Sequence, residues 1–348
     1  MADARRTPGR LAAFALFCAA CLAGAAVYVA QRSRDYRTPP APVRQADTAR
    51  LDRIRAEPRV YFRSVRRDEF GRATVATLAD PDEDRYVSPI VCDRVAFGAR
   101  VGLCLVDNRI RLHPPALLYR IAPSFDPQRT DRLVGVPSRA RVSRDGRYGA
   151  TTVFVDGESY ADSLFSTRTH IVDLAGAHDL PDLEQFTTFK DGRAIRTVDF
   201  NFWGVTFTED SDVFFATLAT AGRTYLVEGR VAERTMRVIR EDVECPSVSP
   251  NGAYIAFKRR HGTGVQWRLH VLERATMREW AVPGETRSID DQVEWLDDGR
   301  ILYGYVEPRG LPEDAMNVWV ASVREDAAEA PRIFIRSASS PTVVRAVE

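Results

Sequence analysis

Short runs of alternating apolar and polar residues recur along most of the chain, and many contain an Asp-Gly or Asn-Gly turn. The clearest run, residues 246–257, reads Pro-Ser-Val-Ser-Pro-Asn-Gly-Ala-Tyr-Ile-Ala-Phe, and an apolar segment follows at 267–272. A period of two predicts β-strands rather than helices. Asn-Gly tolerates the positive φ angles of a tight hairpin. We therefore expect each run to form a hairpin with further strands outside it.

The hairpin pattern repeats at a spacing typical of propeller blades. Its turn residues are Asp145, Asp210, Asn251 and Asp298, which are separated by 65, 41 and 47 residues. The two shorter intervals fit a four-stranded blade, and the longest fits a blade that carries an insertion. Repeats of this kind bury their apolar faces only against neighbouring repeats.

Two further units precede these four, and a lone strand follows them. The expected strands of the first two units are residues 60–62, 73–78, 94–97 and 103–106. Six units in residues 59–348 predict an all-β fold, a six-bladed β-propeller. The segment 341–345 has no hairpin partner after it, so we expect it to pair with the first blade and close the ring, which removes exposed sheet edges. A pair of two-sheet sandwiches is the alternative architecture.

The Ser-Pro-Asn-Gly-Ala-Tyr-Ile-Ala-Phe segment resembles the repeat of the TolB-like six-bladed β-propellers, whose units commonly carry a Ser-Pro-Asp-Gly turn before an Ile-Ala-Phe strand. The resemblance covers residues 59–348 and is strongest over 137–307. With its single N-terminal hydrophobic segment, the chain also resembles the TolB-like translocation proteins. We therefore interpret it as a non-catalytic binding or scaffold module for a protein or a cell-envelope component.

The N-terminal end differs from the repeats. Residues 11–30 carry no charge, and a helix of that length spans about 30 Å, the hydrocarbon thickness of a bilayer. The predicted division is a cytoplasmic tip at 1–10, a transmembrane anchor or signal peptide at 11–31, a proline-rich stalk at 32–58 and the propeller at 59–348. The propeller would lie outside the cytoplasm on a single-pass cell-membrane anchor, or be secreted if the signal is cleaved after Ala25.

Composition narrows the function further. The 49 basic and 48 acidic residues give a net charge of +1, so the chain lacks the global field of a nucleic-acid binder, and we predict no nucleic-acid partner. Arginines flank the N-terminal apolar segment on both sides, so charge leaves its orientation open.

Short motifs for hydrolase, zinc-protease and nucleotide chemistry are missing, and the histidines do not fall at ligand spacing. We accordingly predict no catalytic residue, no metal and no other cofactor.

Two cysteines lie symmetrically about Gly98, as opposed positions of a hairpin would. They are Cys92 and Cys104. In an oxidising, exported compartment the pair could form a cross-strand disulfide. Two buried thiols are the alternative.

Candidate ligand-binding residues lie just before the expected inner strands. An aromatic run at 200–203 and acidic residues at the entries of other blades predict a ligand site with an acidic ring at one mouth of the channel. The candidate residues are Asp199, Asn201, Trp203, Glu244, Asp290, Asp291 and Glu294. The alternatives are aromatic core between blades and solvated turn carboxylates.

A basic run at 258–261 is expected to be solvated.

The alternative function is an enzyme of the lyase or glycosidase type, with Asp199, Glu244 or Asp291 as acid or base.

Overall fold

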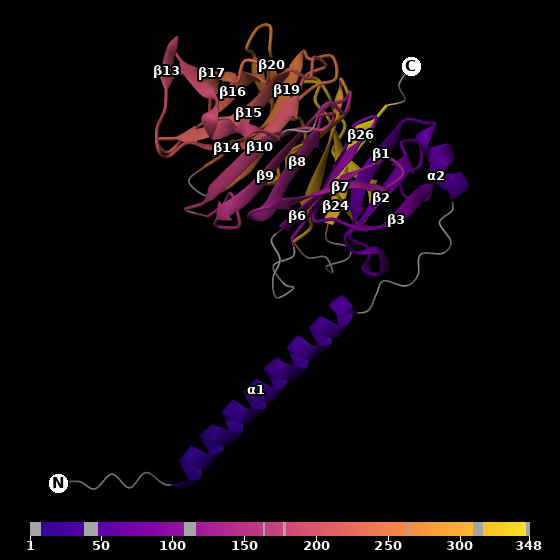
Figure 1. Cartoon of the computed structure of the whole chain (residues 1–348), viewed down its shortest axis with the longest axis vertical. Helices are drawn as coiled ribbons and strands as arrows, with labels where there is room; N and C mark the ends of the chain where they lie inside the picture. Colours follow the sequence, from indigo (N-terminus) through magenta and orange to yellow (C-terminus); the bar gives the residue numbers. More distant parts are fainter. Residues whose placement is uncertain are drawn as a thin grey trace, which may run out of the picture. The chain divides into compact units, whose positions relative to one another are not determined.

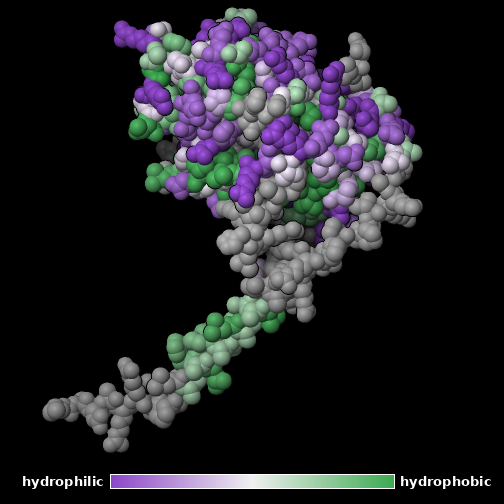
Figure 2. All heavy atoms as spheres, in the orientation of Figure 1, coloured by the Kyte–Doolittle hydropathy of each residue, from purple (hydrophilic) through white to green (hydrophobic). Residues whose placement is uncertain are grey.

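The computed structural model describes residues 8–37, 48–107, 116–162, 164–176, 179–262, 265–308 and 316–345. The chain forms two compact units, Met1–Gln45 and Ala46–Glu348. The first contains helix α1 (Pro8–Arg37), whose large apolar side chains, among them Phe14, Leu16 and Leu22, are exposed (Figure 2). Among the described residues, no helix combines the length and the apolar character needed to cross a membrane.

The strands of the second unit form six sheets, which are the blades of a propeller (Figure 1). The strands of each blade follow one another from the innermost outward. Blade 1 contains β26 (Ala338–Val344), β1 (Arg59–Ser64), β2 (Arg72–Thr77) and β3 (Arg85–Val91). Blade 2 contains β4 (Arg94–Phe97), β5 (Gly102–Val106), β6 (Ala116–Ile121) and β7 (Pro127–Leu133). Blade 3 contains β8 (Val136–Val142), β9 (Tyr148–Asp156), β10 (Ser166–Asp173) and β11 (Asp179–Asp182).

The other three blades follow in chain order. Blade 4 contains β14 (Asn201–Phe207), β15 (Val213–Thr220), β16 (Arg223–Arg230) and β17 (Thr235–Glu241). Blade 5 contains β18 (Glu244–Val248), β19 (Tyr254–Arg260), β20 (Trp267–Glu273) and β21 (Glu279–Ala281). Blade 6 contains β22 (Glu294–Asp297), β23 (Arg300–Val306), β24 (Met316–Ser322) and β25 (Arg332–Ile335).

The ring is closed by the C-terminal strand, as predicted. The innermost strands of the six blades contact one another around the ring in the order β26, β4, β8, β14, β18 and β22. Strand β22 in turn contacts β26, which completes the ring. Strand β26 pairs antiparallel with β1, and Figure 1 shows the two side by side. The sandwich alternative is wrong, because six separate sheets surround one channel.

Blade 4 carries the insertion that the long repeat interval predicted. The 3₁₀ helix η2 (Leu183–Gln185) leads into a hairpin of β12 (Thr187–Lys190) and β13 (Arg193–Ile195), and β12 pairs in parallel with the outer strand β17. This hairpin of β12 and β13 extends blade 4 to six strands.

A second 3₁₀ turn, η1 (Arg67–Glu69), lies in blade 1 and connects β1 to β2.

The repeated Ser-x-Asp/Asn-Gly turns share one hydrogen-bond pattern. The hydroxyl of Ser249 donates to Asn251 at 2.7 Å and accepts from the backbone N–H of Tyr254, and Gly252 takes a φ of 71°. Ser143 makes the equivalent contact with Asp145 at 2.6 Å. The serine thus holds the turn from inside while glycine supplies the left-handed backbone, which explains the motif.

Apolar clusters between neighbouring blades form the core. Val60 of blade 1 packs with Leu302 and Ile335 of blade 6, and all three are fully buried. Helix α2 (Thr48–Arg55) buries Leu51 and Ile54 against blade 1. The compact unit therefore includes a helix that lies ahead of residue 59.

A disulfide joins Cys92 and Cys104. The hairpin register differs from the symmetric arrangement about Gly98, because Val95 lies opposite Cys104. Cys92 lies between β3 and β4, after the last residue of one blade and before the first strand of the next. The bond therefore links blade 2 to the connection that precedes it.

Deleting residues 338–348 should destabilise the whole propeller. The deletion opens the ring and exposes Val60, whose partner in β26 is Val343. We expect the free energy of unfolding to fall by at least about 4 kcal/mol, because two or more valine side chains lose their burial. Urea unfolding of the full-length protein measures the change, and removal of residues 346–348 alone is the control. Equal stability of the two truncated proteins would contradict a closed ring.

Candidate functional site

A cavity of about 320 Å³ lies at one mouth of the channel. It is enclosed by the inner strands β26, β4 and β8 and by the segment 288–292 that leads into β22. Its charged lining consists of Arg63, Arg94, Arg139, Arg141, Asp290 and Asp291. The arginines come from blades 1 to 3 and the aspartates from the entry to blade 6, so positive and negative side chains approach the cavity from different blades.

Two of these arginines, Arg63 and Arg94, are held mainly by backbone carbonyls. Arg63 donates from Nε to the carbonyl of Cys92 at 2.8 Å, and Arg94 donates to the carbonyls of Ser138 and Asp93 at 2.6 and 2.9 Å. In the described part of the chain, neither guanidinium has a carboxylate oxygen within 4 Å. Burial lowers the pKa of both groups, and repulsion from Arg139 lowers that of Arg94 further.

The other two arginines are paired. Arg141 forms an ion pair with Glu294 and also donates to the carbonyl of Val293 at 3.0 Å. Arg139 lies 3.6 Å from the Asp290 carboxylate and stacks over the ring of Tyr160, 4.9 Å from its centroid. Their charges are therefore compensated within the protein.

Asp290 connects the cavity to a buried lysine. Its side chain is 38% exposed and forms an ion pair with Lys258, which is 0% exposed. Burial alone would raise the pKa of the Asp290 carboxyl, but the attraction of Lys258 and Arg139 outweighs it, so the pKa lies below its ordinary value. Asp290 is therefore the ionised partner of a buried ammonium group at neutral pH.

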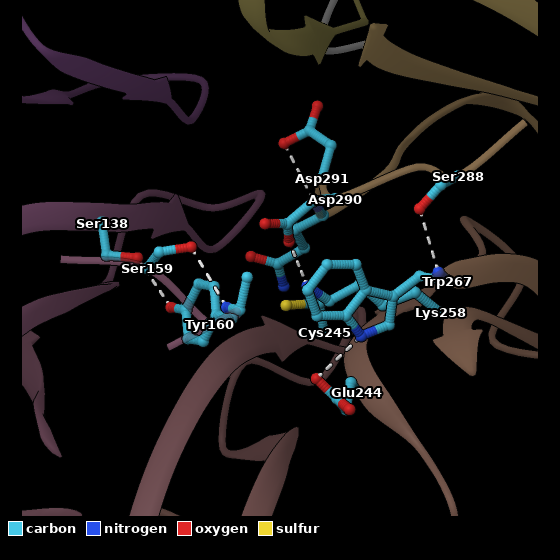
Figure 3. Close-up of polar contacts among 12 residues, drawn as sticks. Ser138, Ser159, Tyr160, Glu244, Cys245, Lys258, Trp267, Ser288, Asp290 and Asp291 are labelled. Atoms are coloured by element: carbon cyan, nitrogen blue, oxygen red, sulfur yellow. Dashed lines mark hydrogen bonds and ion pairs between the residues drawn. The ribbon is translucent and has the colours of Figure 1, made fainter. Parts of the chain in front are cut away.

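Aromatic side chains enclose the ammonium group of Lys258 (Figure 3). Its Nζ lies 4.2 Å from the ring centroid of Trp267 and 4.8 Å from that of Tyr160. Tyr160 comes from the long loop between β9 and β10, is buried, and shares a 2.6 Å hydrogen bond with Ser138. The loop of blade 3 thus places the Tyr160 ring beside the Lys258 ammonium of blade 5, which lies between two aromatic rings.

The predicted acidic residues separate into different environments. Asp291 lines the cavity and accepts hydrogen bonds from the backbone N–H groups of Gly304 and Gln292 at 2.7 and 2.9 Å. Glu244 is 1% exposed and accepts from Arg260 and from Trp267 Nε1 at 2.8 and 3.2 Å. Glu294, described above with Arg141, also accepts from the backbone N–H of Val343.

The remaining predicted site residues serve the blades themselves. Asp199 is exposed and accepts hydrogen bonds at Thr220 and Ala221; hydrogen bonds from Thr197 and these two groups lower its pKa to about 2. The Asn201 amide accepts from the backbone N–H of Thr167 at 2.8 Å. Trp203 is 1% exposed and packs on Tyr160. The acidic ring is thus only partly assembled: Asp290 and Asp291 line the cavity, and Glu294 reaches it through Arg141.

Sequence reasoning missed most of the positive and aromatic side chains at this mouth. The missed residues are Arg63, Arg94, Arg139, Arg141, Tyr160, Lys258 and Trp267. Lys258 carried a signal, because it continues the apolar strand Ile255-Ala256-Phe257 and is one of only two lysines. The solvated reading of 258–261 is wrong at this residue, which is fully buried.

A closed ring of six blades around a channel defines a six-bladed β-propeller. The sequence matches no protein-family model and no curated protein. Among solved structures it is similar to TolB from Acinetobacter baumannii, at 13% identity and a TM-score of 0.54, over 83% of this chain and 66% of that one. A putative TolB from Agrobacterium tumefaciens is 9% identical over 82% of this chain and 91% of that one, at a TM-score of 0.49.

A chain of the nidogen/laminin complex is also similar, with 12% identity and a TM-score of 0.51 over 83% of this chain and 98% of that one. At these identities the likeness shows the fold alone. The chain has a six-bladed β-propeller fold similar to that of TolB, and it spans about two thirds of the Acinetobacter TolB chain.

Asp290→Asn should destabilise the fold by leaving the Lys258 ammonium buried without its carboxylate. We expect a loss of about 3 kcal/mol at pH 7, the lower end for a broken buried pair, since Asp290 is partly exposed. The double variant Lys258→Met/Asp290→Asn removes both charges and should recover most of the loss in urea unfolding.

The pH dependence has a definite sign. Because the folded pKa of Asp290 is lowered, its contribution is complete above the unfolded value of about 3.9 and is lost as the pH falls through the folded value. The double variant should lack this part of the acid sensitivity. If the double variant is no more stable than Asp290→Asn, the unpaired Lys258 charge is not the cause of the stability lost in Asp290→Asn.

Proposed function

We propose that the protein is a non-catalytic binding module that holds part of a protein or cell-envelope partner at the channel mouth. The observation that carries this proposal is the cavity itself, because its volume lies at the lower end of ligand pockets and charged groups converge on it. Val306 lines the cavity and is 51% exposed, so the cavity meets solvent there. The similar chain of the nidogen/laminin complex belongs to an assembly of proteins, which agrees with a protein partner.

The carboxylates of the site favour binding over acid–base catalysis. A glycosidase needs one carboxyl group whose pKa is raised so that it can act as an acid. The pKa values of Asp199 and Asp290 are instead lowered. Glu244 is engaged by Arg260 and Trp267. A lyase or glycosidase remains the alternative, with Asp291 as its best placed carboxylate.

We further propose that the propeller lies outside the cytoplasm and is tethered through residues 11–31. The uncharged run at 11–30 supports the tether. The disulfide supports the compartment, because such bonds persist in oxidising surroundings and are rare in the cytosol. N-terminal sequencing of the native protein distinguishes a retained anchor from cleavage after Ala25.

Cys92 and Cys104 should resist alkylation in freshly isolated protein until a reductant is added. Cys92→Ser should lower the free energy of unfolding by about 2 kcal/mol, because the disulfide closes only a short loop. Mass-spectrometric counting of alkylated thiols tests the first expectation and urea unfolding the second. Free alkylation of both thiols in the native protein would place the propeller in a reducing compartment and overturn this localisation.

Val306→Trp should block binding at the mouth without disturbing the fold, because the side chain is half exposed at the rim of the cavity. Tagged full-length protein, crosslinked in its own cell envelope, should capture its partner at least about tenfold less efficiently with this substitution. Val155→Trp is the matched control, since Val155 is 43% exposed on β9 and does not line the cavity.

Both variants should keep the wild-type unfolding temperature. Equal capture by Val306→Trp and Val155→Trp would mean that the partner binds elsewhere on the propeller.

A further inference from the structure

We propose that the channel mouth is a receptor for a carboxylate group, which Arg63 and Arg94 bind from one side of the cavity. This inference rests on the proposed binding function and adds the chemical class of the ligand. It reverses the expectation of an acidic ring, because four arginines but only two aspartates line the cavity.

The charges are compensated unevenly around the cavity. Arg141 is neutralised by Glu294, and Asp290 is shared by Arg139 and Lys258. Arg63 donates to a backbone carbonyl and stacks over Phe70, 4.6 Å from the ring centroid, and Arg94 donates to two backbone carbonyls. Within the described residues, the carboxylates of Asp93 and Asp291 attract Arg63 and Arg94, respectively, only from beyond ion-pair distance. A partly buried guanidinium without a carboxylate is costly, and an incoming anion relieves that cost.

The two arginines are placed to act together. Arg63 belongs to β1 and Arg94 is the first residue of β4, and both strands border β26. Arg63 donates to the carbonyl of Cys92 and Arg94 to that of the next residue, Asp93, so both guanidinium groups lie along one short segment of backbone. Each group presents several N–H donors in a planar fork, the geometry that matches a carboxylate.

Side chains of blade 6, which neighbours blade 1 in the ring, limit what else the ligand can carry. Tyr305, Val306 and Met316 of blade 6 line the cavity together with Asp291. An aliphatic stem can therefore lie against blade 6 while its carboxylate reaches the arginines. Asp290 and Asp291 would repel a dianion such as phosphate more strongly than a monoanion, which favours a carboxylate.

Titrations followed by NMR on the full-length protein in detergent test the inference. The probes are butanoate as a free monoanionic organic acid, acetyl-Leu-Glu-Leu-amide as a peptide-borne carboxylate, acetyl-Leu-Gln-Leu-amide as its neutral match, and inorganic phosphate. At least one carboxylate probe should bind tenfold or more tightly than the neutral peptide and phosphate. The tighter of the two carboxylate probes identifies the source of the group.

Arg63→Gln should weaken binding of that probe about tenfold, the effect of losing one charge-assisted hydrogen bond. Arg94→Lys keeps the positive charge but loses the planar pair of N–H donors, so it should weaken binding less than Arg94→Gln. Because Arg94→Lys keeps the charge, it also serves as the variant to use if Arg94→Gln does not fold. The matched control is Arg324→Gln, which removes the same charge from a side chain that is 72% exposed beside Asp326. It should bind like the wild type.

Three results would overturn the inference: equal binding of the glutamate and glutamine peptides, tighter binding of phosphate than of both carboxylates, or wild-type binding by folded Arg63→Gln and Arg94→Lys. Failure of this inference is distinguishable from failure of the proposed function. If Val306→Trp abolishes partner capture while Arg63→Gln does not, the mouth is the binding site but carboxylate recognition is wrong. If Val306→Trp does not reduce capture, the proposed function itself is wrong.

Discussion

The pairing of β26 with β1 is the interaction on which the rest of the structure depends. It brings the last strand of the chain to the innermost position of the first blade, where it separates β22 from β4. Without it, the two end blades would expose sheet edges, and the cavity would lose its β26 wall. The closed ring and the cavity are therefore consequences of one strand pairing.

Closure also makes the charge pattern of the mouth possible. Blades 1 to 3 contribute arginines, and the segment before blade 6 contributes aspartates; only a ring brings these distant parts of the chain to one cavity. Lys258 then determines how the charges divide. Because its buried ammonium engages Asp290, that carboxylate is less available to the arginines across the cavity.

The sequence predicted the fold more fully than the site. Strand alternation and the turns at Asn251 and Asp145 predicted the blades, since both features depend on local backbone preferences. Closure followed from a different observation, the segment 341–345 that has no hairpin partner after it. The register at Cys104 was wrong because Val95, not Cys92, faces it, which symmetry about a glycine could not show. Glu294 pairs with Arg141 of another blade, a contact that no local pattern encodes. Glu244 meets Arg260 and Trp267 within its own blade, but across strands whose pairing register the sequence did not predict.

The same reason explains why acidic residues suggested an acidic ring. Carboxylates before inner strands are visible in the sequence, but their effect depends on the arginines that the ring brings opposite them. Arg63 and Arg94 are two of 49 basic residues, and nothing in their local sequence distinguishes them. What distinguishes them, within the part of the chain that the structure describes, is the lack of a carboxylate at ion-pair distance in a partly buried site, which is a property of the assembled ring. The carboxylate recognition that we propose for this mouth therefore rests on how the ring places its charges rather than on a motif.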